Sequence, residues 1–262
     1  MIEQDRTGGL LNHARWIENY PGFPGGISGS DLVRLLRCHL KKTGVQVLRA
    51  TVQKIAFRNN QFTVKTSRRS IRGRILVIAS GTMPRRLPDA VIDPKVRGRI
   101  LYDPRRLLKR HAKTVAIIGA GDAAFDYALG LAPMHRIILL NRGSKPRCLP
   151  LLLDRARREL GIRIISGFRI RTIRSVSGAV HINARDGRYV RVDYVIPALG
   201  RLPSLDYLDA RMRIRIRSLI FRHRAWMIGD VRNDRFRQTG ISVGDGIRCA
   251  MEIADKSKAG SR

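Results

Sequence analysis

Three small residues at a fixed spacing, Gly119, Gly121 and Ala124, form the pattern G-x-G-x-x-A within the segment 113–143. A short apolar run precedes the pattern, and a helical pattern and a second apolar run follow it. In such a unit the first glycine permits a tight turn and the second lets the backbone approach a pyrophosphate. The small third residue lets the helix pack close to the strand. The sequence therefore predicts a dinucleotide-binding βαβ unit with Asp122 in its turn, the alternative being a turn that serves close packing alone.

The residues after the second apolar run select the nicotinamide cofactor. They read N-R-G-S-K-P-R and contain no carboxylate, whereas an NAD site usually places Asp or Glu there to bind the ribose hydroxyl. Arg142 and Arg147 suit a 2′-phosphate, because a guanidinium makes paired, charge-assisted hydrogen bonds. NADP is therefore expected, with NADPH preferred over NADH. The alternative is chance, since 42 of the 52 basic residues are arginine.

The chain is strongly basic, with 52 Lys and Arg against 20 Asp and Glu and a net charge of +32. Such a field attracts nucleic acid or anionic membranes without a specific site. The arginines are spread along the whole chain, so both a general arginine enrichment and a polyanion-binding surface remain open. In R-M-R-I-R-I-R, residues 211–217, arginine alternates with apolar residues, which predicts a strand with one basic face.

Two segments are built alike, 62–81 and 180–200. Each has an alternating strand, a turn, a second strand and an apolar run that ends at a glycine, Gly81 or Gly200. The second segment carries Asp186-Gly187, a strong hairpin signal. We expect two related modules, each ending at a ligand-binding edge of a sheet.

The two ends of the chain carry further candidate ligand contacts. Near the start, a Pro- and Gly-rich loop within 16–28 runs into an amphipathic helix, a composition typical of a surface or ligand-facing loop. Near the end, a strand finishing at 227–228 precedes Gly229-Asp230, and open α/β sheets bind ligands at such strand ends. A final helix is expected to reach about Ala254, with a disordered tail after it.

Together these motifs resemble the thioredoxin-reductase-like branch of the pyridine nucleotide-disulfide oxidoreductase superfamily. V-I-A-S-G is similar to its flavin-domain strand, and I-I-G-A-G-D-A-A to its NADPH fingerprint. L-N-R-G-S-K-P-R resembles its phosphate clamp, and G-D-V with R-Q-T-G its closing flavin motif. The resemblance implies an α/β fold of two Rossmann-like, three-layer dinucleotide-binding domains. The NAD(P) domain, 109–193, is inserted in an N-terminally truncated FAD domain formed by 1–108 and 194–262.

The resemblance also implies which residues bind the cofactors FAD and NADP. Glu3 would lie on the adenosine ribose, Asp230 on the ribityl chain, and the Arg237-Gln238 turn against the isoalloxazine. No catalytic residue is nominated, because the cofactors carry the chemistry. No metal ligand is nominated either, because neither the cysteines nor the histidines have the spacing of a metal site. The full FAD set is Glu3, Gly8, Gly9, Asn19, Tyr20, Pro21, Ser80, Gly81, Gly200, Gly229, Asp230, Arg237, Gln238 and Thr239. The NADP set is Gly119, Gly121, Asp122, Ala124, Arg142 and Arg147.

The sequence departs from the family pattern in two places. The family's opening strand and G-x-G-x-x-G turn, which bind the FAD pyrophosphate, do not precede Glu3. Three explanations stay open: a start further upstream, a strand supplied by a partner, or a decayed flavoprotein. The redox C-x-x-C expected before the NADPH fingerprint is also absent, and Cys38, Cys148 and Cys249 are scattered. The pattern therefore resembles the ferredoxin–NADP reductase type.

The expected function is an NAD(P)H-dependent flavin oxidoreductase that passes hydride from NADPH to FAD and electrons to a small-molecule or protein acceptor. Two alternatives stay open, a non-catalytic nucleotide-binding remnant and a polyanion-binding protein. No apolar run approaches the ~20 residues of a membrane helix and no signal peptide is visible, so a cytoplasmic protein is expected. A homodimer is a further expectation, since relatives often form dimers.

Overall fold

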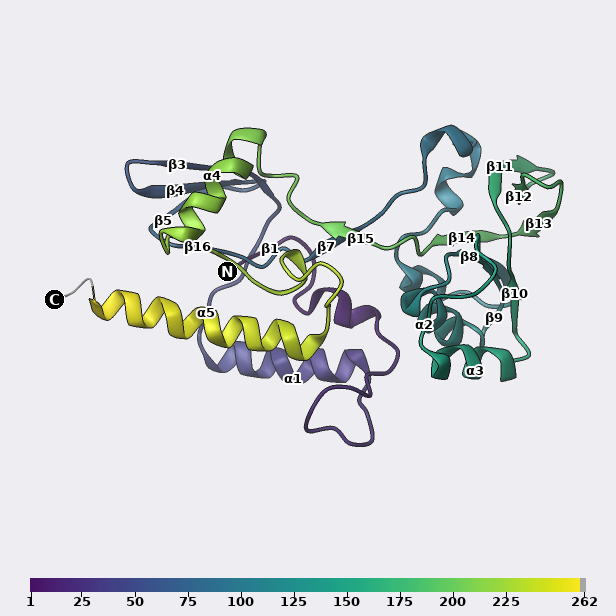
Figure 1. Cartoon of the computed structure of the whole chain (residues 1–262), viewed down its shortest axis with the longest axis horizontal. Coiled ribbons are helices and arrows are strands. Elements are labelled where there is room, and N and C mark those ends of the chain that lie inside the picture. The colour runs from purple at the N-terminus through teal and green to yellow at the C-terminus, as the bar shows by residue number, and fades with distance from the viewer. Residues whose placement is uncertain (260–262) are drawn as a thin grey trace. The chain divides into compact units, whose positions relative to one another are not determined.

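The computed structural model of the chain describes residues 1–259 and contains two compact units. The first, here called the discontinuous unit, combines Met1–Met83 with the chain from Leu202 onward, and the second, the continuous unit, is Pro84–Arg201. The strands β7 (Thr82–Pro84) and β15 (Arg201–Pro203) pair with each other where the chain passes between the units. Figure 1 shows the elements of each unit. The assignment of 1–108, 109–193 and 194–262 to cofactor domains stays a prediction.

The continuous unit is built on a four-stranded parallel sheet in the order β10-β9-β8-β14. Helices pack on one face of this sheet and a three-stranded antiparallel sheet, β11-β12-β13, packs on the other. The strands are β8 (Lys113–Ile118), β9 (His135–Leu140), β10 (Ile162–Ile165), β11 (Ile170–Val176), β12 (Ala179–Ala184), β13 (Tyr189–Val192) and β14 (Tyr194–Pro197), and the helices are α2 (Asp122–Leu131) and α3 (Pro150–Arg158).

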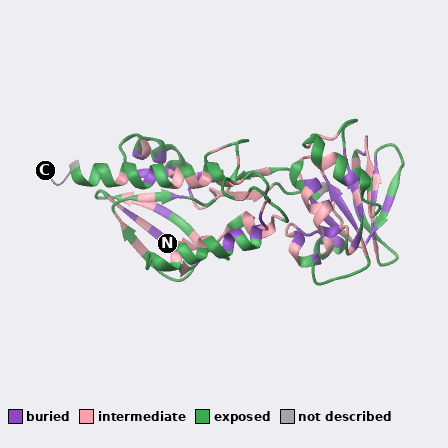
Figure 2. Ribbon diagram, turned by 90° about the horizontal axis from the view of Figure 1, so that it is seen from below, coloured by how far each residue is buried: buried purple, intermediate pink, exposed green. Residues whose placement is uncertain are grey.

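Strand β8 explains why the apolar run is continuous. Val115 and Ile117 pack with the helices, while Ala116 and Ile118 pack with the antiparallel sheet. Because successive side chains point to opposite faces and both faces are covered, every position from Val115 to Ile118 is apolar. Figure 2 shows these strands as the buried centre of the continuous unit. The predicted strand, turn, helix and strand are therefore confirmed.

The discontinuous unit contains parallel strands in two separate pairs, β1 with β2 and β6 with β16. Its described part also contains a three-stranded antiparallel sheet, β3-β4-β5, and three α-helices. Ile2 of β1 packs against the cluster that contains Ile78 of β6 and Ala225 of β16, so both pairs contribute to one core. The strands are β1 (Ile2–Glu3), β2 (Leu48–Arg49), β3 (Val52–Arg58), β4 (Gln61–Thr66), β5 (Ser70–Gly73), β6 (Leu76–Ile78) and β16 (Ala225–Met227), and the helices are α1 (Gly29–Lys42), α4 (Ala210–Phe221) and α5 (Thr239–Ala259).

The two related modules predicted from the sequence are present. One consists of β4, β5 and β6, and the other of β12, β13 and β14. In the second module Gly187 has φ 87°, and Asp186 Oδ1 accepts a hydrogen bond from the Arg188 backbone N–H at 3.1 Å, as the hairpin signal predicted. The structure adds β3 and β11, which complete a three-stranded antiparallel sheet in each module.

The prediction of a strand at 211–217 is wrong, because these residues lie in α4. Met212, Ile216 and Leu219 are buried at intervals of four and three residues, which is the spacing of a helix face. Asp209 caps the helix, its Oδ1 accepting a hydrogen bond from the Met212 N–H at 2.8 Å. Met212 and Ile216, two of the apolar residues that alternate with arginine, therefore also belong to the buried stripe of a helix.

The end predicted for the last helix is also wrong. Helix α5 continues past Ala254 to Ala259, so the first residues of the predicted tail are helical. In this added turn Ser257 Oγ donates a hydrogen bond to the Ile253 carbonyl at 2.9 Å. The rest of the predicted tail, 260–262, lies outside the described residues.

A carboxylate in α5 fixes the turn that follows β16. Asp245 Oδ2 accepts hydrogen bonds from Asn233 Nδ2 at 2.6 Å and from the Gly229 N–H at 2.9 Å. These bonds, with that from Asn233 contributing most, hold the pKa of Asp245 below its ordinary value. The short helix η5 (Gly229–Val231) is thereby tied to α5.

We expect the contribution of Asp245 to stability to fall at acid pH. Because its pKa is lower in the folded state than in the unfolded one, the contribution is complete above the unfolded pKa of about 3.9. It is lost as the pH falls from there through the folded pKa. Thermal unfolding between about pH 6 and about pH 3, a range that spans the unfolded pKa, should show wild type losing more stability on acidification than Asp245→Asn.

The matched control is Asp255→Asn, the same exchange at an exposed position of the same helix. Its stability should follow wild type at every pH. If wild type and Asp245→Asn lose stability in parallel, the proposed role of the carboxylate is wrong.

Candidate functional site

The turn after β8 admits only glycine at its first position. Gly119 has φ 134°, and a Cβ added there would lie 2.3 Å from the carbonyl oxygen of Ala198. Ala198 is held in place because its N–H donates to the Ile118 carbonyl at 2.8 Å. The end of β8 therefore lies directly against the residue that follows β14, and the chain must turn sharply.

Space is open beside the second glycine. A Cβ added to Gly121 would meet no atom within 4 Å, and this residue precedes the first turn of α2 without a side-chain cap. Ala124 is completely buried against the sheet, so the helix packs close to β8. An uncapped helix N-terminus beside open space fits a pyrophosphate, which accepts hydrogen bonds from the free N–H groups.

The arginine-bearing loop after β9 is fastened to this turn through its backbone. The Arg147 N–H donates to the Ala120 carbonyl at 2.7 Å, and the Leu149 N–H donates to Asp122 Oδ1 at 2.8 Å. Asn141 is buried, and its Oδ1 accepts a hydrogen bond from the Gly143 N–H at 3.1 Å. Arg142 and Arg147 are both exposed beside the turn. The structure thus brings all six residues of the predicted NADP set into one region of the continuous unit.

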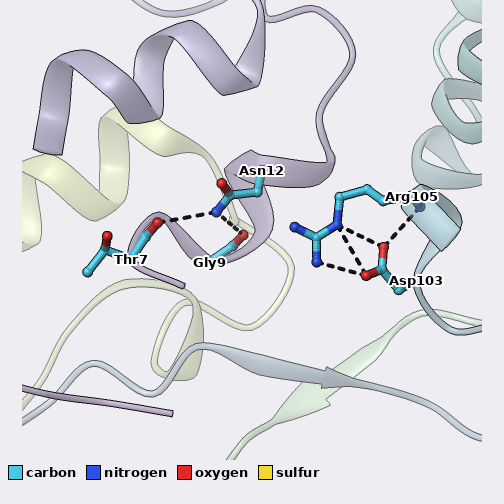
Figure 3. A network of polar contacts seen from close by, with 5 residues as sticks. All are labelled: Thr7, Gly9, Asn12, Asp103 and Arg105. Carbon is cyan, nitrogen blue, oxygen red and sulfur yellow. Dashed lines mark hydrogen bonds and ion pairs between the residues drawn. The ribbon is translucent and has the colours of Figure 1, made fainter. Parts of the chain in front are cut away.

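In the discontinuous unit, the segment around Gly8 and Gly9 is fixed by side chains. Gly8 has φ 105°, and a Cβ there would lie 2.6 Å from Val33. Asn12 Nδ2 donates to the carbonyls of Thr7 and Gly9, at 3.3 Å and 3.0 Å, as Figure 3 shows. The segment is therefore a glycine turn that packs against α1 and is hydrogen-bonded to Asn12.

The loop that contains Asn19, Tyr20 and Pro21 reaches the start of α5. Asn19 Nδ2 donates a hydrogen bond to Gln238 Oε1 at 2.8 Å, although the two residues are 219 positions apart. Thr239 is the first residue of α5. A groove of ≈ 320 Å³ is lined by 18–24. Two segments predicted to contact the flavin are therefore adjacent.

The carboxyl ends of β6 and β16 meet at one edge, because the strands are parallel and Ile78 pairs with Met227. This places Ser80 and Gly81 near Gly229 and Asp230. Ser80 Oγ donates to the Ser204 carbonyl at 2.6 Å and accepts from the Tyr207 hydroxyl at 2.8 Å. The Ser80 hydroxyl is therefore hydrogen-bonded to the segment 204–207 of the same chain, a role that the sequence did not indicate.

Glu3 lies at the end of β1, in a groove of ≈ 360 Å³ shared with Arg37 and Arg49. An acidic side chain at a parallel strand end is the usual partner of a ribose hydroxyl, so the groove fits the adenosine part of FAD. Gly200 differs from the other predicted FAD residues because it belongs to the continuous unit, where its carbonyl accepts from the Arg85 N–H at 2.9 Å.

Three residues that position these segments were missed from the sequence. Asn12 and Asp245 form hydrogen bonds with backbone groups, and the Tyr207 hydroxyl donates to the Ser80 hydroxyl. No local pattern predicts these three contacts. In the continuous unit Asp103 begins the short helix η4 (Pro104–Leu107) and pairs with Arg105 at 2.7 Å (Figure 3).

Neither a metal centre nor a dithiol is indicated by the described side chains. Residues 1–259 contain no group of three or more His, Cys, Asp and Glu placed to hold a metal ion. The cysteines are unpaired, and burial raises the pKa of the Cys148 and Cys249 thiols. Within the same described residues, no helix is both long and apolar enough to cross a membrane.

Comparison with known proteins identifies the family. Thioredoxin reductase 2 of Arabidopsis thaliana is 22% identical over 278 residues, which cover 96% of this chain and 72% of that protein. Ferredoxin–NADP reductase of Ehrlichia canis is 26% identical over 205 residues, 72% of this chain and 60% of its own. The crystal structure of Lactococcus lactis thioredoxin reductase superposes with a TM-score of 0.82 at 23% identity, covering 97% of this chain and 89% of that one.

The superposition confirms the predicted fold class. The pyridine nucleotide-disulphide oxidoreductase family matches residues 2–246, nearly the whole chain. The predicted enzyme class, a thioredoxin-reductase-like oxidoreductase, is confirmed by the same comparisons. With its glycine turn, arginine loop and paired strand ends, this chain belongs to the pyridine nucleotide-disulphide oxidoreductase family.

Proposed function

We propose that the chain is an NADPH-dependent flavin oxidoreductase that delivers electrons to its acceptor without a C-x-x-C dithiol. The observation that carries the proposal is the open, uncapped glycine turn at Gly121 with the arginine loop fastened to it through Arg147. When bound, NADPH would supply hydride and FAD would accept it, so the protein needs no acid or base of its own.

The chain's own residues would bind and orient the two cofactors. The α2 N-terminus would donate hydrogen bonds to the NADPH pyrophosphate, and Arg142 and Arg147 would bind the 2′-phosphate. Glu3 would accept a hydrogen bond from the FAD ribose, and the contact between Asn19 and Gln238 would order the loop against the flavin. Because the cysteines lack the C-x-x-C spacing, we favour a ferredoxin-type or small-molecule acceptor over thioredoxin.

A second candidate is a nucleotide-binding protein that retains NADPH but not FAD. The observation in its favour is that the parallel strands of the discontinuous unit form two separate pairs, β1–β2 and β6–β16. Strand edges outside such pairs leave backbone groups unbonded and weaken the platform that a flavin needs.

Flavin binding distinguishes the two candidates. The purified chain is mixed with FAD, freed of excess and examined by visible absorbance. The oxidoreductase proposal expects about one flavin per chain, with its absorbance bleached by NADPH under anaerobic conditions. NADPH binding without retained flavin supports the second candidate, and binding of neither cofactor contradicts both.

The two glycines of the turn should respond differently to alanine. Gly119→Ala places a methyl group on the Ala198 carbonyl at a strained φ, so we expect a loss of more than about 2 kcal/mol in stability. Gly121→Ala has free space and an ordinary φ, and should cost at most about 1 kcal/mol as a changed helix cap.

The same methyl group at Gly121 would occupy the space proposed for the pyrophosphate. Gly121→Ala should therefore weaken NADPH binding at least about tenfold, measured by nucleotide fluorescence on the folded variant. If Gly121→Ala binds NADPH as tightly as wild type, the pyrophosphate does not lie against this turn.

Arg142 should distinguish NADPH from NADH. Arg142→Ala removes a charge-assisted contact with the 2′-phosphate, so we expect NADPH affinity to fall about 10- to 100-fold while NADH affinity stays unchanged. The matched control is Arg136→Ala, an exposed arginine near the opposite end of β9. Equal losses for both nucleotides, or equal effects of both substitutions, would rule out the specific contact and leave only general charge.

A further inference from the structure

Helix α4 leaves two large apolar side chains in water. Met212, Ile216 and Leu219 face the core, where they pack with residues of β3 and β4 such as Ile55 and Phe62. Ile214 and Phe221 are 76% and 85% exposed. Figure 1 shows α4 lying against the antiparallel strands and β16. Isolated exposed apolar residues are common, but these two lie on one side of the helix together with arginines.

Ile214 and Phe221 lie on the same side of the helix, because seven residues make nearly two turns. Arg217 lies between them, three residues after one and four before the other, and Arg211 lies one turn before Ile214. We call Arg211, Ile214, Arg217, Ser218 and Phe221 the outer face of α4. All five residues are exposed.

The arginines of α4 divide into two groups. Arg213 donates to the carbonyls of Leu208 and Leu205, at 3.0 Å and 3.1 Å, and Arg215 stacks over the ring of Phe57 at 5.2 Å. Within the described part of the chain, no hydrogen bond or ion pair occupies the guanidinium group of Arg211 or Arg217. The hydrogen bond from the Met212 N–H contributes most to lowering the pKa of the Asp209 carboxyl, and Arg211 lies close enough to help lower it. The outer face carries no carboxylate. It is therefore basic and apolar together.

We propose that the outer face of α4 binds the surface of an anionic phospholipid membrane. Ile214 and Phe221 would enter the boundary between headgroups and acyl chains, and the guanidinium groups of Arg211 and Arg217 would bind lipid phosphates. Protruding side chains can enter a membrane interface directly. An acidic protein partner would instead need a recess shaped to receive them. Nucleic acid would use the charge but not Ile214, which has no aromatic face for stacking on bases.

This attachment would be peripheral, with α4 lying on the surface of the membrane. It goes beyond the proposed reductase function and does not depend on it. The readout is therefore binding of the full chain to vesicles, whether or not the chain holds flavin.

The test compares vesicles of phosphatidylcholine alone with vesicles that also contain phosphatidylserine, by co-sedimentation at near-physiological salt. Wild type should bind the mixed vesicles and not the neutral ones. The double variant Ile214→Ser/Phe221→Ser should bind the mixed vesicles at least about tenfold more weakly. Because both side chains are exposed, its thermal unfolding should match that of wild type.

The matched control is Leu160→Ser, which removes a fully exposed apolar side chain beside Arg157 and Arg158 in the continuous unit. Its vesicle binding should equal that of wild type. Retained binding by the double variant, an equal loss in Leu160→Ser, or no binding of wild type to mixed vesicles would each overturn the proposal. The same holds if duplex DNA, and not the vesicles, distinguishes wild type from the double variant.

Discussion

Burial of the continuous unit's parallel sheet on both faces is the constraint from which the nucleotide site follows. Val115, Ala116 and Ile117 of β8 are completely excluded from solvent. A polar side chain at these buried positions would have no hydrogen-bond partner and would destabilise the fold. Polar side chains that bind or react are therefore confined to the strand ends. At the carboxyl end the close approach of Gly119 to Ala198 forces the turn that exposes the α2 N-terminus.

The discontinuous unit depends on a different kind of interaction. Its parallel strands are two or three residues long and occur in separate pairs, so backbone hydrogen bonding alone fixes little of its geometry. Side chains fix the candidate flavin contacts: Asn19 with Gln238, Ser80 with Tyr207, and Asp245 with Gly229. A site held by single polar contacts is more sensitive to substitution and acid than one held by a buried sheet.

The sequence predicted the continuous unit's turn well because its information is local. The glycine spacing, the apolar runs and the helix pattern all lie within 113–143, and their order along the chain is typical of a βαβ unit. The hairpin at Asp186 was predictable for the same reason. The error at α4 arose because arginine at every second position matches a strand, while the buried residues Met212, Ile216 and Leu219 also match a helix. Local pattern could not decide, and packing on β3 and β4 did.

Contacts distant in the sequence were not predictable in the same way. The hydrogen bonds from Asn19 to Gln238 and from the Gly229 N–H to Asp245 depend on where the chain folds back. The local sequence around a single helical carboxylate such as Asp245 does not predict which groups it will accept hydrogen bonds from. The candidate site could therefore be predicted as a set of motifs, but not as the network that positions them.

The arginine excess sets a final constraint on any function of this chain. With 52 basic and 20 acidic residues, most basic side chains cannot find an internal carboxylate, whatever the fold. Some are used structurally, as when Arg188 pairs with Asp186 and stacks on Phe168. The remainder attract every polyanion alike. Specific recognition must therefore come from the structure around an arginine. At Arg147 this is a loop held by backbone hydrogen bonds, and at Arg217 it is two exposed apolar side chains.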